Sequence, residues 1–295
     1  MVGGRRSGVF PVSPSYTRIS PRAFGQAAVG PTPTLPPLGC VGVRDVLLAL
    51  AKAAAEAVRG LEDPGARVGS GYSGAPTSRI DLVAEDALLA KVEEIGLAVN
   101  ILTEERGLID RGHEDLLVAD PIDGTVNALR GLGNWAISLA MGRGTLAGIR
   151  HGLVYEPRSG DVYSAEAGQG AFLNGERLRT RKLDAGSTLY LVYLGQSAHA
   201  DSYRVAAAAR RTRALGSASL ELCMVARGAA NLYYFHSETD ARVRIVDIAA
   251  GVLLVREAGG IVVDLERKTL DLPLSTAART NLIAAGDGAV LEAIP

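Results

Sequence analysis

Apolar and polar residues follow one another along this chain in blocks that predict two helices near its start. Apolar side chains recur at helical spacing from Arg44 to Val58, where Gly60 stops the run, and again from Ile80 to Glu94. The stretch between the two runs, residues 65–77, is rich in Gly and Ser. We therefore expect it to form a mobile loop.

Short apolar runs separated by polar turns then predict strands. The run Leu116–Ala119 has no polar break, which is typical of a buried strand, and Pro121 should prevent that strand from continuing. Asn174-Gly175 is a strong signal for a two-residue hairpin turn. Farther along, strands and helices alternate, with helices expected over residues 201–210, 220–226 and 247–258.

Residues 1–41 differ in kind from the rest of the chain. They contain no acidic residue, four arginines and several Pro and Gly. This composition favours a disordered arm or a wrongly assigned start codon over an organelle transit segment, and the apolar core of a secretory signal is missing. The remainder reads as two joined sheet-and-helix halves, residues 42–178 and 179–295, with the chemistry at their seam.

The richest candidate for chemistry is the turn that begins at Asp120, directly after the predicted buried strand. Asp120 and Asp123 place two carboxylates on one sharp turn, and hard cations prefer such oxygen ligands. Gly124 lets the backbone approach a ligand, and the N–H groups of a following helix start suit an anion. One turn could hold metal and phosphate together. The alternative is an ordinary turn or helix cap, in which Asp-Gly pairs are common.

Composition narrows the class of protein without naming it. The 295 residues are 47% hydrophobic, enough for a large core, and a net charge of −1 argues against general nucleic-acid binding. No apolar run approaches the ~18 residues of a membrane span. Cys40 and Cys223 form neither a disulfide framework nor a zinc spacing, so a reducing cytoplasm fits best. Asn and Gln are sparse, a feature of heat-stable proteins.

Three segments resemble the inositol monophosphatase family. The octet Asp120-Pro-Ile-Asp-Gly-Thr-Val-Asn127 is similar to the first family signature, Asp-Pro-Ile/Leu-Asp-Gly-Thr-x-Asn, and Glu104-Glu105 to its metal-binding Glu pair. Val246-Asp247-Ile-Ala-Ala-Gly251, followed by Glu257-Ala-Gly-Gly260, resembles the second signature, with Val246 where many members have Trp. The resemblance covers about residues 44–290. It implies an α/β protein with the layered αβαβα sugar-phosphatase fold of the inositol monophosphatase/fructose bisphosphatase type.

The resemblance also implies a metal site. Its ligands would be the side chains of four acids and one main-chain carbonyl, namely Glu104, Asp120, Asp123, Asp247 and the Ile122 oxygen. They would bind two or three Mg²⁺ ions, with Mn²⁺ as a possible substitute. Four acids gathered in one place need cations in any case, because their charges repel one another.

Catalytic and substrate-binding residues follow from the same resemblance. Glu104 would bridge metals, and Thr125 with Asp81 would orient the attacking water, with Glu85 as the alternative acid. The N–H groups of Gly124 and Thr125 would hold phosphate oxygens. On the substrate side we expect the turn Gly216-Ser217-Ala218, the acid Asp240, and the arginines Arg210, Arg211 and Arg213 for a second phosphate. Alternatively, these arginines form a solvated basic helix end.

The loop before Asp247 looks more like that of archaeal family members, which often hydrolyse both inositol monophosphate and fructose 1,6-bisphosphate. We therefore expect a homodimeric Mg²⁺-dependent phosphatase that acts on a small phosphorylated polyol or sugar, without nucleic-acid or membrane partners. Two alternatives remain. One is a 3′-phosphoadenosine 5′-phosphate phosphatase of the same superfamily, and the other is a catalytically silent binding or regulatory homologue.

Overall fold

The computed structural model describes residues 42–72, 74, 76–238 and 242–295. The arm 1–41 and Asp240 lie outside the described residues. Seven α-helices occur in the described part: α1 Val43–Ala57, α2 Arg79–Ile95, α3 Thr125–Leu129, α4 Ala200–Ala208, α5 Ala218–Ala226, α6 Ile245–Glu257 and α7 Gly288–Ala293. None of these helices combines the length and apolar character that a bilayer crossing requires.

Most strands belong to two sheets. The first has eight strands in the order β10-β9-β8-β7-β6-β5-β3-β4, and only its β3–β5 pair is parallel. Its strands are β3 Asn100–Thr103, β4 Gly107–Ile109, β5 Leu116–Asp123, β6 Ala136–Gly142, β7 Ile149–Glu156, β8 Asp161–Glu166, β9 Gly170–Leu173 and β10 Glu176–Arg177.

The second sheet has five strands in the order β12-β11-β13-β17-β15, with β11 parallel to both of its neighbours. Its strands are β11 Leu189–Val192, β12 Arg211–Arg213, β13 Leu232–Phe235, β15 Ile261–Val263 and β17 Leu282–Ala285. Two small antiparallel pairs complete the set: β1 Arg67–Ser70 with β2 Pro76–Ser78, and β14 Val243–Arg244 with β16 Arg279–Thr280.

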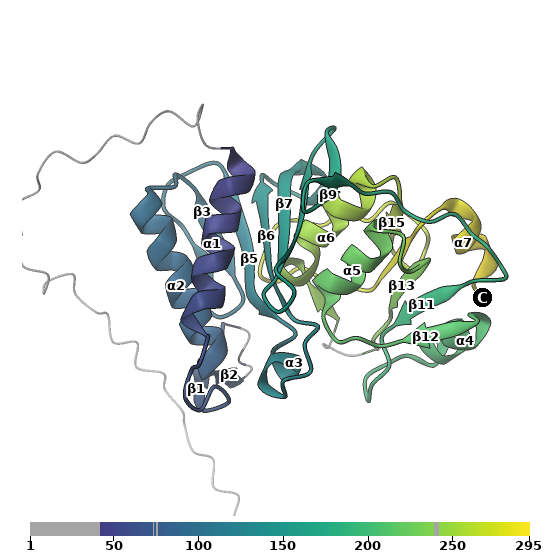
Figure 1. The fold of residues 1–295 in the computed structure, drawn as a ribbon, viewed down its shortest axis with the longest axis horizontal. Helices are drawn as coiled ribbons and strands as arrows, with labels where there is room; N and C mark the ends of the chain where they lie inside the picture. The colour runs from purple at the N-terminus through teal and green to yellow at the C-terminus, as the bar shows by residue number, and fades with distance from the viewer. Residues whose placement is uncertain (1–41, 73, 75, 239–241) are drawn as a thin grey trace, which may run out of the picture. The chain divides into compact units, whose positions relative to one another are not determined.

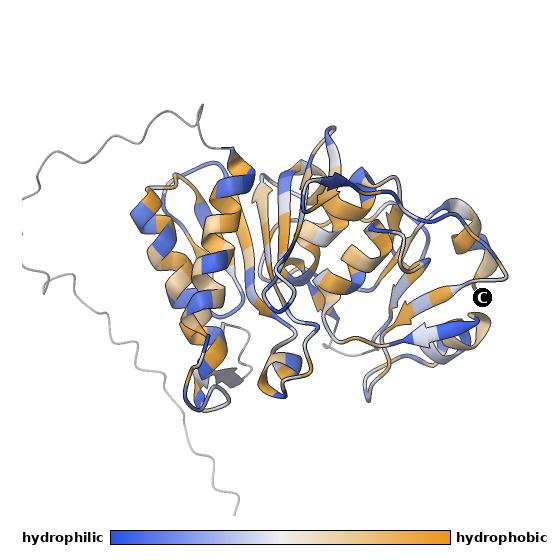
Figure 2. Cartoon of the chain, in the orientation of Figure 1, coloured by the Kyte–Doolittle hydropathy of each residue, from blue (hydrophilic) through white to orange (hydrophobic). Residues whose placement is uncertain are grey.

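The elements stack in five layers (Figure 1). Helices α1 and α2 cover one face of the eight-stranded sheet, and α5 and α6 lie between the two sheets, while α4 and α7 cover the second sheet. In Figure 2 the outer helices α1 and α2 alternate between hydrophobic and hydrophilic positions, as one-sided burial requires. Helix α6, by contrast, is buried continuously from Ile245 to Val255. The observed α/β layering agrees with the fold that the signatures imply.

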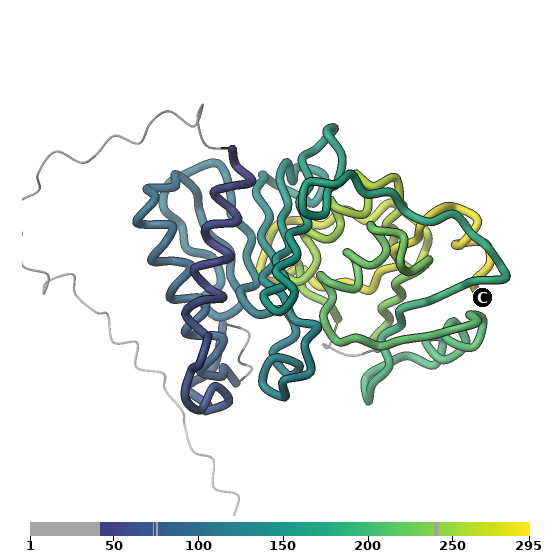
Figure 3. The backbone as a smooth tube through the Cα atoms, in the orientation of Figure 1, coloured from purple at the N-terminus to yellow at the C-terminus, as the bar shows by residue number. Residues whose placement is uncertain are grey.

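Small residues let the inner layers approach one another. A Cβ on Gly152 of β7 would lie 3.2 Å from the backbone of Ala250, and one on Gly251 would lie 2.5 Å from a methyl group of Leu222 in α5. The tube trace in Figure 3 follows the chain through the first sheet and then into the second, before α6 returns between them. The predicted boundary at residues 178–179 falls between β10 and β11. The division into two domains stays a prediction.

Two predictions about local structure are wrong. Residues 65–77 are not simply a loop, because β1 and β2 pair across them. Strand β5 continues through Pro121 to Asp123. The strand tolerates proline there because the parallel pairing with β3 ends at Ala119 and the register with β6 shifts between Asp120 and Asp123, so no neighbour needs the missing N–H.

Other local predictions are confirmed. Helix α2 lies within one residue of the predicted span at each end. Asn174 and Gly175 join β9 to β10, and both have positive φ, 52° and 89°, as a type I′ turn requires.

Candidate metal and phosphate site

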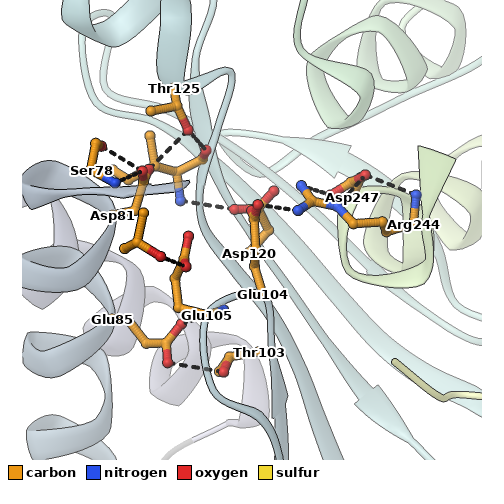
Figure 4. Close-up of polar contacts among 12 residues, drawn as sticks. Ser78, Asp81, Glu85, Thr103, Glu104, Glu105, Asp120, Thr125, Arg244 and Asp247 are labelled. Carbon is orange, nitrogen blue, oxygen red and sulfur yellow. Dashed lines mark hydrogen bonds and ion pairs between the residues drawn. The ribbon is translucent and has the colours of Figure 1, made fainter. Parts of the chain in front are cut away.

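Three carboxylates meet at one edge of the eight-stranded sheet. Strands β3 and β5 are parallel with Thr103 beside Ala119, so the next residues, Glu104 and Asp120, come out at the same edge. Asp247 enters from the first turn of α6. One carboxylate oxygen from each of the three acids lies within 4.8 Å of those of the other two. Figure 4 shows them together, with Asp120 between the two helical layers.

Burial makes this cluster electrostatically costly. Asp120 is 1% exposed, and burial together with the charges of Glu104 and Asp247 raises its pKa well above the ordinary value. Burial also raises the pKa of Glu104 to about 7, against the lowering effect of Arg244. One Asp120 oxygen accepts the Ile122 N–H at 3.0 Å, whereas the other, Oδ2, is buried without a hydrogen-bond partner. An orphan oxygen among carboxylates fits a divalent cation.

Arg244 is a functional residue that the sequence predictions missed. Its Nη2 donates to Asp247 Oδ1 at 2.8 Å, and its Nη1 donates to Glu104. The guanidinium thus supplies positive charge where the acids need it (Figure 4). Its position three residues before Asp247, at a helix start, was the sequence signal that it could contact that acid. Asp247 is the third residue of α6, and its carboxylate accepts the main-chain N–H of Arg244, the residue before the helix, at 2.9 Å.

Asp123 points elsewhere. Its carboxylate accepts the Ser217 hydroxyl at 2.6 Å and the Ser219 N–H at 2.7 Å, so it ties the Asp120 turn to the start of α5. Burial and the charge of Asp247 raise its pKa to about 6 despite these bonds. The structure therefore brings together three of the four predicted acidic ligands. Metal binding by Asp123, and by the Ile122 carbonyl, stays a prediction.

Thr125 and Asp81 form the predicted pair. The Thr125 hydroxyl donates to Asp81 Oδ1 at 2.8 Å, and the Ser78 hydroxyl holds the other Asp81 oxygen at 2.5 Å. Glu85 is fully buried, and its carboxylate accepts hydrogen bonds from the Thr103 hydroxyl at 3.0 Å and the Glu105 N–H at 3.2 Å. Asp81 is therefore the acid that contacts Thr125, and its role beside an attacking water stays a prediction.

Gly124 lies where the Asp120 turn meets the predicted substrate turn. Its φ of 97° favours glycine, and a Cβ there would lie 3.0 Å from the Asn134 oxygen and 3.3 Å from the Gly216 oxygen. Asn127 links the same segments, because its amide donates to the oxygens of Leu215 at 2.7 Å and Asn134 at 2.9 Å. The last residue of the octet thus joins the two turns.

A cavity of about 660 Å³ opens beside these groups. The predicted residues Asp123, Gly216, Ser217, Ala218 and Asp247 line it, together with Asn127, Tyr193, Glu221, Phe235, Arg242, Arg244 and Arg279. Glu221 was missed, although an acid within the apolar run Leu220–Cys223 was a signal. It accepts the Leu215 N–H at 2.9 Å, and burial raises its pKa to about 8.

The predicted arginines are not at this cavity. Arg211 and Arg213 lie exposed on the edge strand β12 and are not among the lining residues, and they are also not the end of a helix. Arg279 is better placed. It sits opposite Arg244 in the β14–β16 pair, and its Nη1 is buried without a hydrogen-bond partner. Two like charges side by side around an orphan donor suit an anion.

Comparison with known proteins agrees with this geometry. A model of the inositol monophosphatase family matches residues 42–294. A fructose-1,6-bisphosphatase/inositol-1-monophosphatase from Thermococcus kodakarensis is 37% identical over 237 residues, which cover 80% of this chain and 88% of the relative. One from Methanothermobacter thermautotrophicus is 38% identical over 243 residues, or 77% and 85% of the two chains.

A solved inositol monophosphatase-fructose 1,6-bisphosphatase has the same fold, with a TM-score of 0.74 and 28% identity over 84% of this chain and 96% of that one. The chain belongs to the inositol monophosphatase family, a family of metal-dependent phosphatases. It is a phosphoric monoester hydrolase.

Proposed function

We propose that the protein is a Mg²⁺-dependent phosphomonoesterase that hydrolyses inositol 1-phosphate, fructose 1,6-bisphosphate or both. The observation that carries the proposal is Asp120, whose Oδ2 is buried and unpaired. One carboxylate oxygen of Asp120 lies within 4.8 Å of those of Glu104 and Asp247, and Asp247 lines the cavity. Two or three Mg²⁺ ions, or Mn²⁺ in their place, would bind to these acids and to Asp123 and the Ile122 carbonyl. Bound divalent ions supply the charge that activates water and stabilises the leaving oxygen.

The chain's own groups divide the remaining work. Asp81 accepts the Thr125 hydroxyl proton at 2.8 Å, and this pair would orient a water and take up its proton. The N–H groups of Gly124 and Thr125 lie at the start of α3 and would hold phosphate oxygens. Asn127 and Asp123 hold the Gly216-Ser217-Ala218 turn against the reacting site, where it would position the polyol hydroxyls. Asp240 keeps its predicted contact with those hydroxyls as part of the proposal.

The test is phosphate release by the purified full-length chain. Inositol 1-phosphate, fructose 1,6-bisphosphate and 3′-phosphoadenosine 5′-phosphate would each be supplied with Mg²⁺, with Mn²⁺ or with EDTA. We expect turnover of one or both of the first two, and loss with EDTA. Asp120→Asn keeps the side-chain shape but removes a charge that the cations need, so it should abolish turnover. Asp45→Asn, an exposed acid in α1, is the matched control.

Three outcomes would contradict parts of the proposal. Near wild-type activity of Asp120→Asn at saturating Mg²⁺ would show that this turn is not the metal site. Exclusive turnover of the adenosine compound would identify the 3′-phosphoadenosine 5′-phosphate phosphatase. No release from any substrate in a folded, Mg²⁺-loaded protein would favour a silent binding homologue.

A further inference from the structure

A second group of metal-ligating side chains lies apart from the carboxylate cluster. His199, Asp201 and His236 each offer one ligand atom, and these three atoms lie within 4.8 Å of one another. The whole chain has four histidines, so half of them meet at this point. Imidazole nitrogen suits Zn²⁺, Co²⁺ and Ni²⁺, whereas Mg²⁺ prefers oxygen, so the two clusters differ in the ions they select.

The backbone holds the two histidines side by side. His199 precedes α4 and His236 follows β13, and the His199 N–H donates to the His236 oxygen at 3.0 Å. The neighbouring residues Ala198 and Ser237 form an antiparallel bridge. As a result the imidazole rings stack, with centroids 3.9 Å apart. The two side chains come from distant segments but start from a fixed scaffold, which lowers the entropy cost of binding a shared ion.

The hydrogen bonds engage both nitrogens of His199 and one nitrogen of His236. His199 Nδ1 accepts the Asp201 N–H at 3.1 Å, and its Nε2 lies 3.3 Å from the Glu238 carboxylate, to which it donates in this tautomer. The Tyr234 hydroxyl contacts His236 Nδ1 at 3.2 Å, which leaves Nε2 of that ring. Metal-binding histidines characteristically donate their other N–H to a carboxylate, as His199 does here.

The position of Asp201 completes the donor set. Its Oδ2 lies 3.2 Å from His199 Nδ1, the nitrogen that accepts the Asp201 N–H, so an ion bound between them would replace that N–H as the partner of the nitrogen lone pair. Two ligands of a tetrahedral ion with 2.0–2.1 Å bonds are separated by roughly 3.4 Å. The Asp201–His199 pair therefore has the spacing of two ligands already, and the His236 ring would turn out of the stack to bind the same ion.

We propose that His199, Asp201 and His236 bind one transition-metal dication, of which Zn²⁺ is the representative, with Glu238 orienting His199. The ion joins the segment after β11 to the end of β13. Tyr193 and Phe235 of those segments stack at 4.4 Å and line the cavity, so the metal fastens the cavity rim. None of its ligands belongs to the carboxylate cluster.

The experiment measures binding of Zn²⁺ alone by competition with a chromophoric chelator, using the full-length protein in excess Mg²⁺ so that the carboxylate cluster is occupied. Co²⁺ replaces Zn²⁺ in parallel, because tetrahedral Co²⁺ absorbs visible light strongly. We expect one equivalent of tight binding and a higher Tm with Zn²⁺. Loss of an outer partner costs about 10–100-fold in affinity, so His199→Gln and His236→Gln should each cost at least about 100-fold.

Controls separate this site from others. His113→Gln changes an exposed histidine on another loop and should bind Zn²⁺ as wild type does, and so should Asp120→Asn. Circular dichroism and the wild-type-like Tm of the metal-free His variants verify that they fold. Absence of Zn²⁺ and Co²⁺ binding in wild type, or binding that persists in both His variants, would overturn the proposal. Loss of phosphatase activity with intact Zn²⁺ binding would count against the proposed function and not against this site.

Discussion

Arg244 is the residue whose role is hardest to read from composition, since it is one of many arginines. It contacts Glu104 and Asp247, two of the acids that would bind metal. A guanidinium and a metal ion therefore compete for the same carboxylates. Without Arg244, the negative charges of these acids should be uncompensated in the metal-free protein. When metal is present, the same acids should be free to bind the ions.

We accordingly expect Arg244→Met to lower the stability of the metal-free protein by about 1–3 kcal/mol, between the effects of breaking exposed and buried ion pairs, because these pairs are partly buried. It should also tighten Mg²⁺ binding several-fold. Thermal melts in EDTA and calorimetric Mg²⁺ titrations measure the two effects, with the exposed Arg59→Met as control. Weaker Mg²⁺ binding in the variant would show that Arg244 supports the metal instead of competing with it.

Glu221 permits a prediction about pH, because burial raises its pKa from 4.5 to about 8. The folded protein keeps the proton through this window while the unfolded chain has lost it. Wild-type stability should therefore be fully present below pH 4.5 and fall as the pH rises towards 8, by up to about 1.4 kcal/mol per pH unit. Glu221→Gln has no proton to lose and still accepts the Leu215 N–H.

Urea unfolding at several pH values between 5 and 8, in EDTA, measures this difference. The stability of Glu221→Gln relative to wild type should increase with pH, and the exposed Glu266→Gln should show no such trend. Parallel pH profiles for wild type and Glu221→Gln would mean that Glu221 is ionised in the folded protein.

The residue scale also shows what could be predicted. Asp120 and Asp123 were recognisable as a chemical turn because their spacing is a property of the sequence. That Asp123 binds the start of α5 while Asp120 stays with the other acids depends on Ser217 and Ser219, which lie in a segment farther along the chain. The pairing of the two cavity arginines could not be predicted for the same reason, since Arg244 and Arg279 meet only through β14–β16 pairing.

At the scale of elements, the packing of α6 against α5 depends on a missing side chain. A Cβ on Gly251 would lie 2.5 Å from Leu222 Cδ1 and 2.7 Å from its Cβ. Gly251→Ala should therefore destabilise the protein by about 1–3 kcal/mol through overpacking. Urea unfolding measures the loss, and Leu222→Ala in the same chain should make the added methyl group less harmful.

Gly65→Ala is the matched control, because a Cβ there makes only ordinary contact, 3.8 Å from Leu129. Equal effects of the two glycine changes would refute close packing as the cause. The small residues Ala249, Ala250 and Gly251 of α6 are visible in the sequence. The sequence does not show which neighbour each small residue faces. Apolar residues lie on all sides of α6, so the helix has no hydrophobic period that would indicate its orientation.

At the scale of the whole molecule, the cavity is assembled from parts that no single segment contains. The Asp120 turn comes from the first sheet, the Gly216 turn from the start of α5, and the arginines from the β14–β16 pair. The spans of the five longer helices and the layered fold class could be predicted, because they follow from local sequence patterns and signatures. The distribution of charge around the cavity could not, because it arises when these distant parts meet.

This assembly changes the prediction for a substrate with two phosphates. The second phosphate of fructose 1,6-bisphosphate must be paired when it leaves water, and Arg279 offers a buried Nη1 without a partner opposite Arg244. Inositol 1-phosphate has only hydroxyls at that end. Arg279→Gln should therefore lower kcat/KM for fructose 1,6-bisphosphate much more than for inositol 1-phosphate. A charge-assisted contact is worth ~1.5–3 kcal/mol, or roughly tenfold or more.

The double variant Arg211→Ala, Arg213→Ala provides the internal comparison, since both side chains are exposed on β12 and away from the cavity. It should leave the ratio of the two kcat/KM values unchanged. If the β12 variant shifts this ratio and Arg279→Gln does not, the second phosphate binds at β12, as the sequence alone suggested. Equal losses on both substrates for Arg279→Gln would instead point to a defect of the β14–β16 pair, which a lower Tm of that variant would reveal.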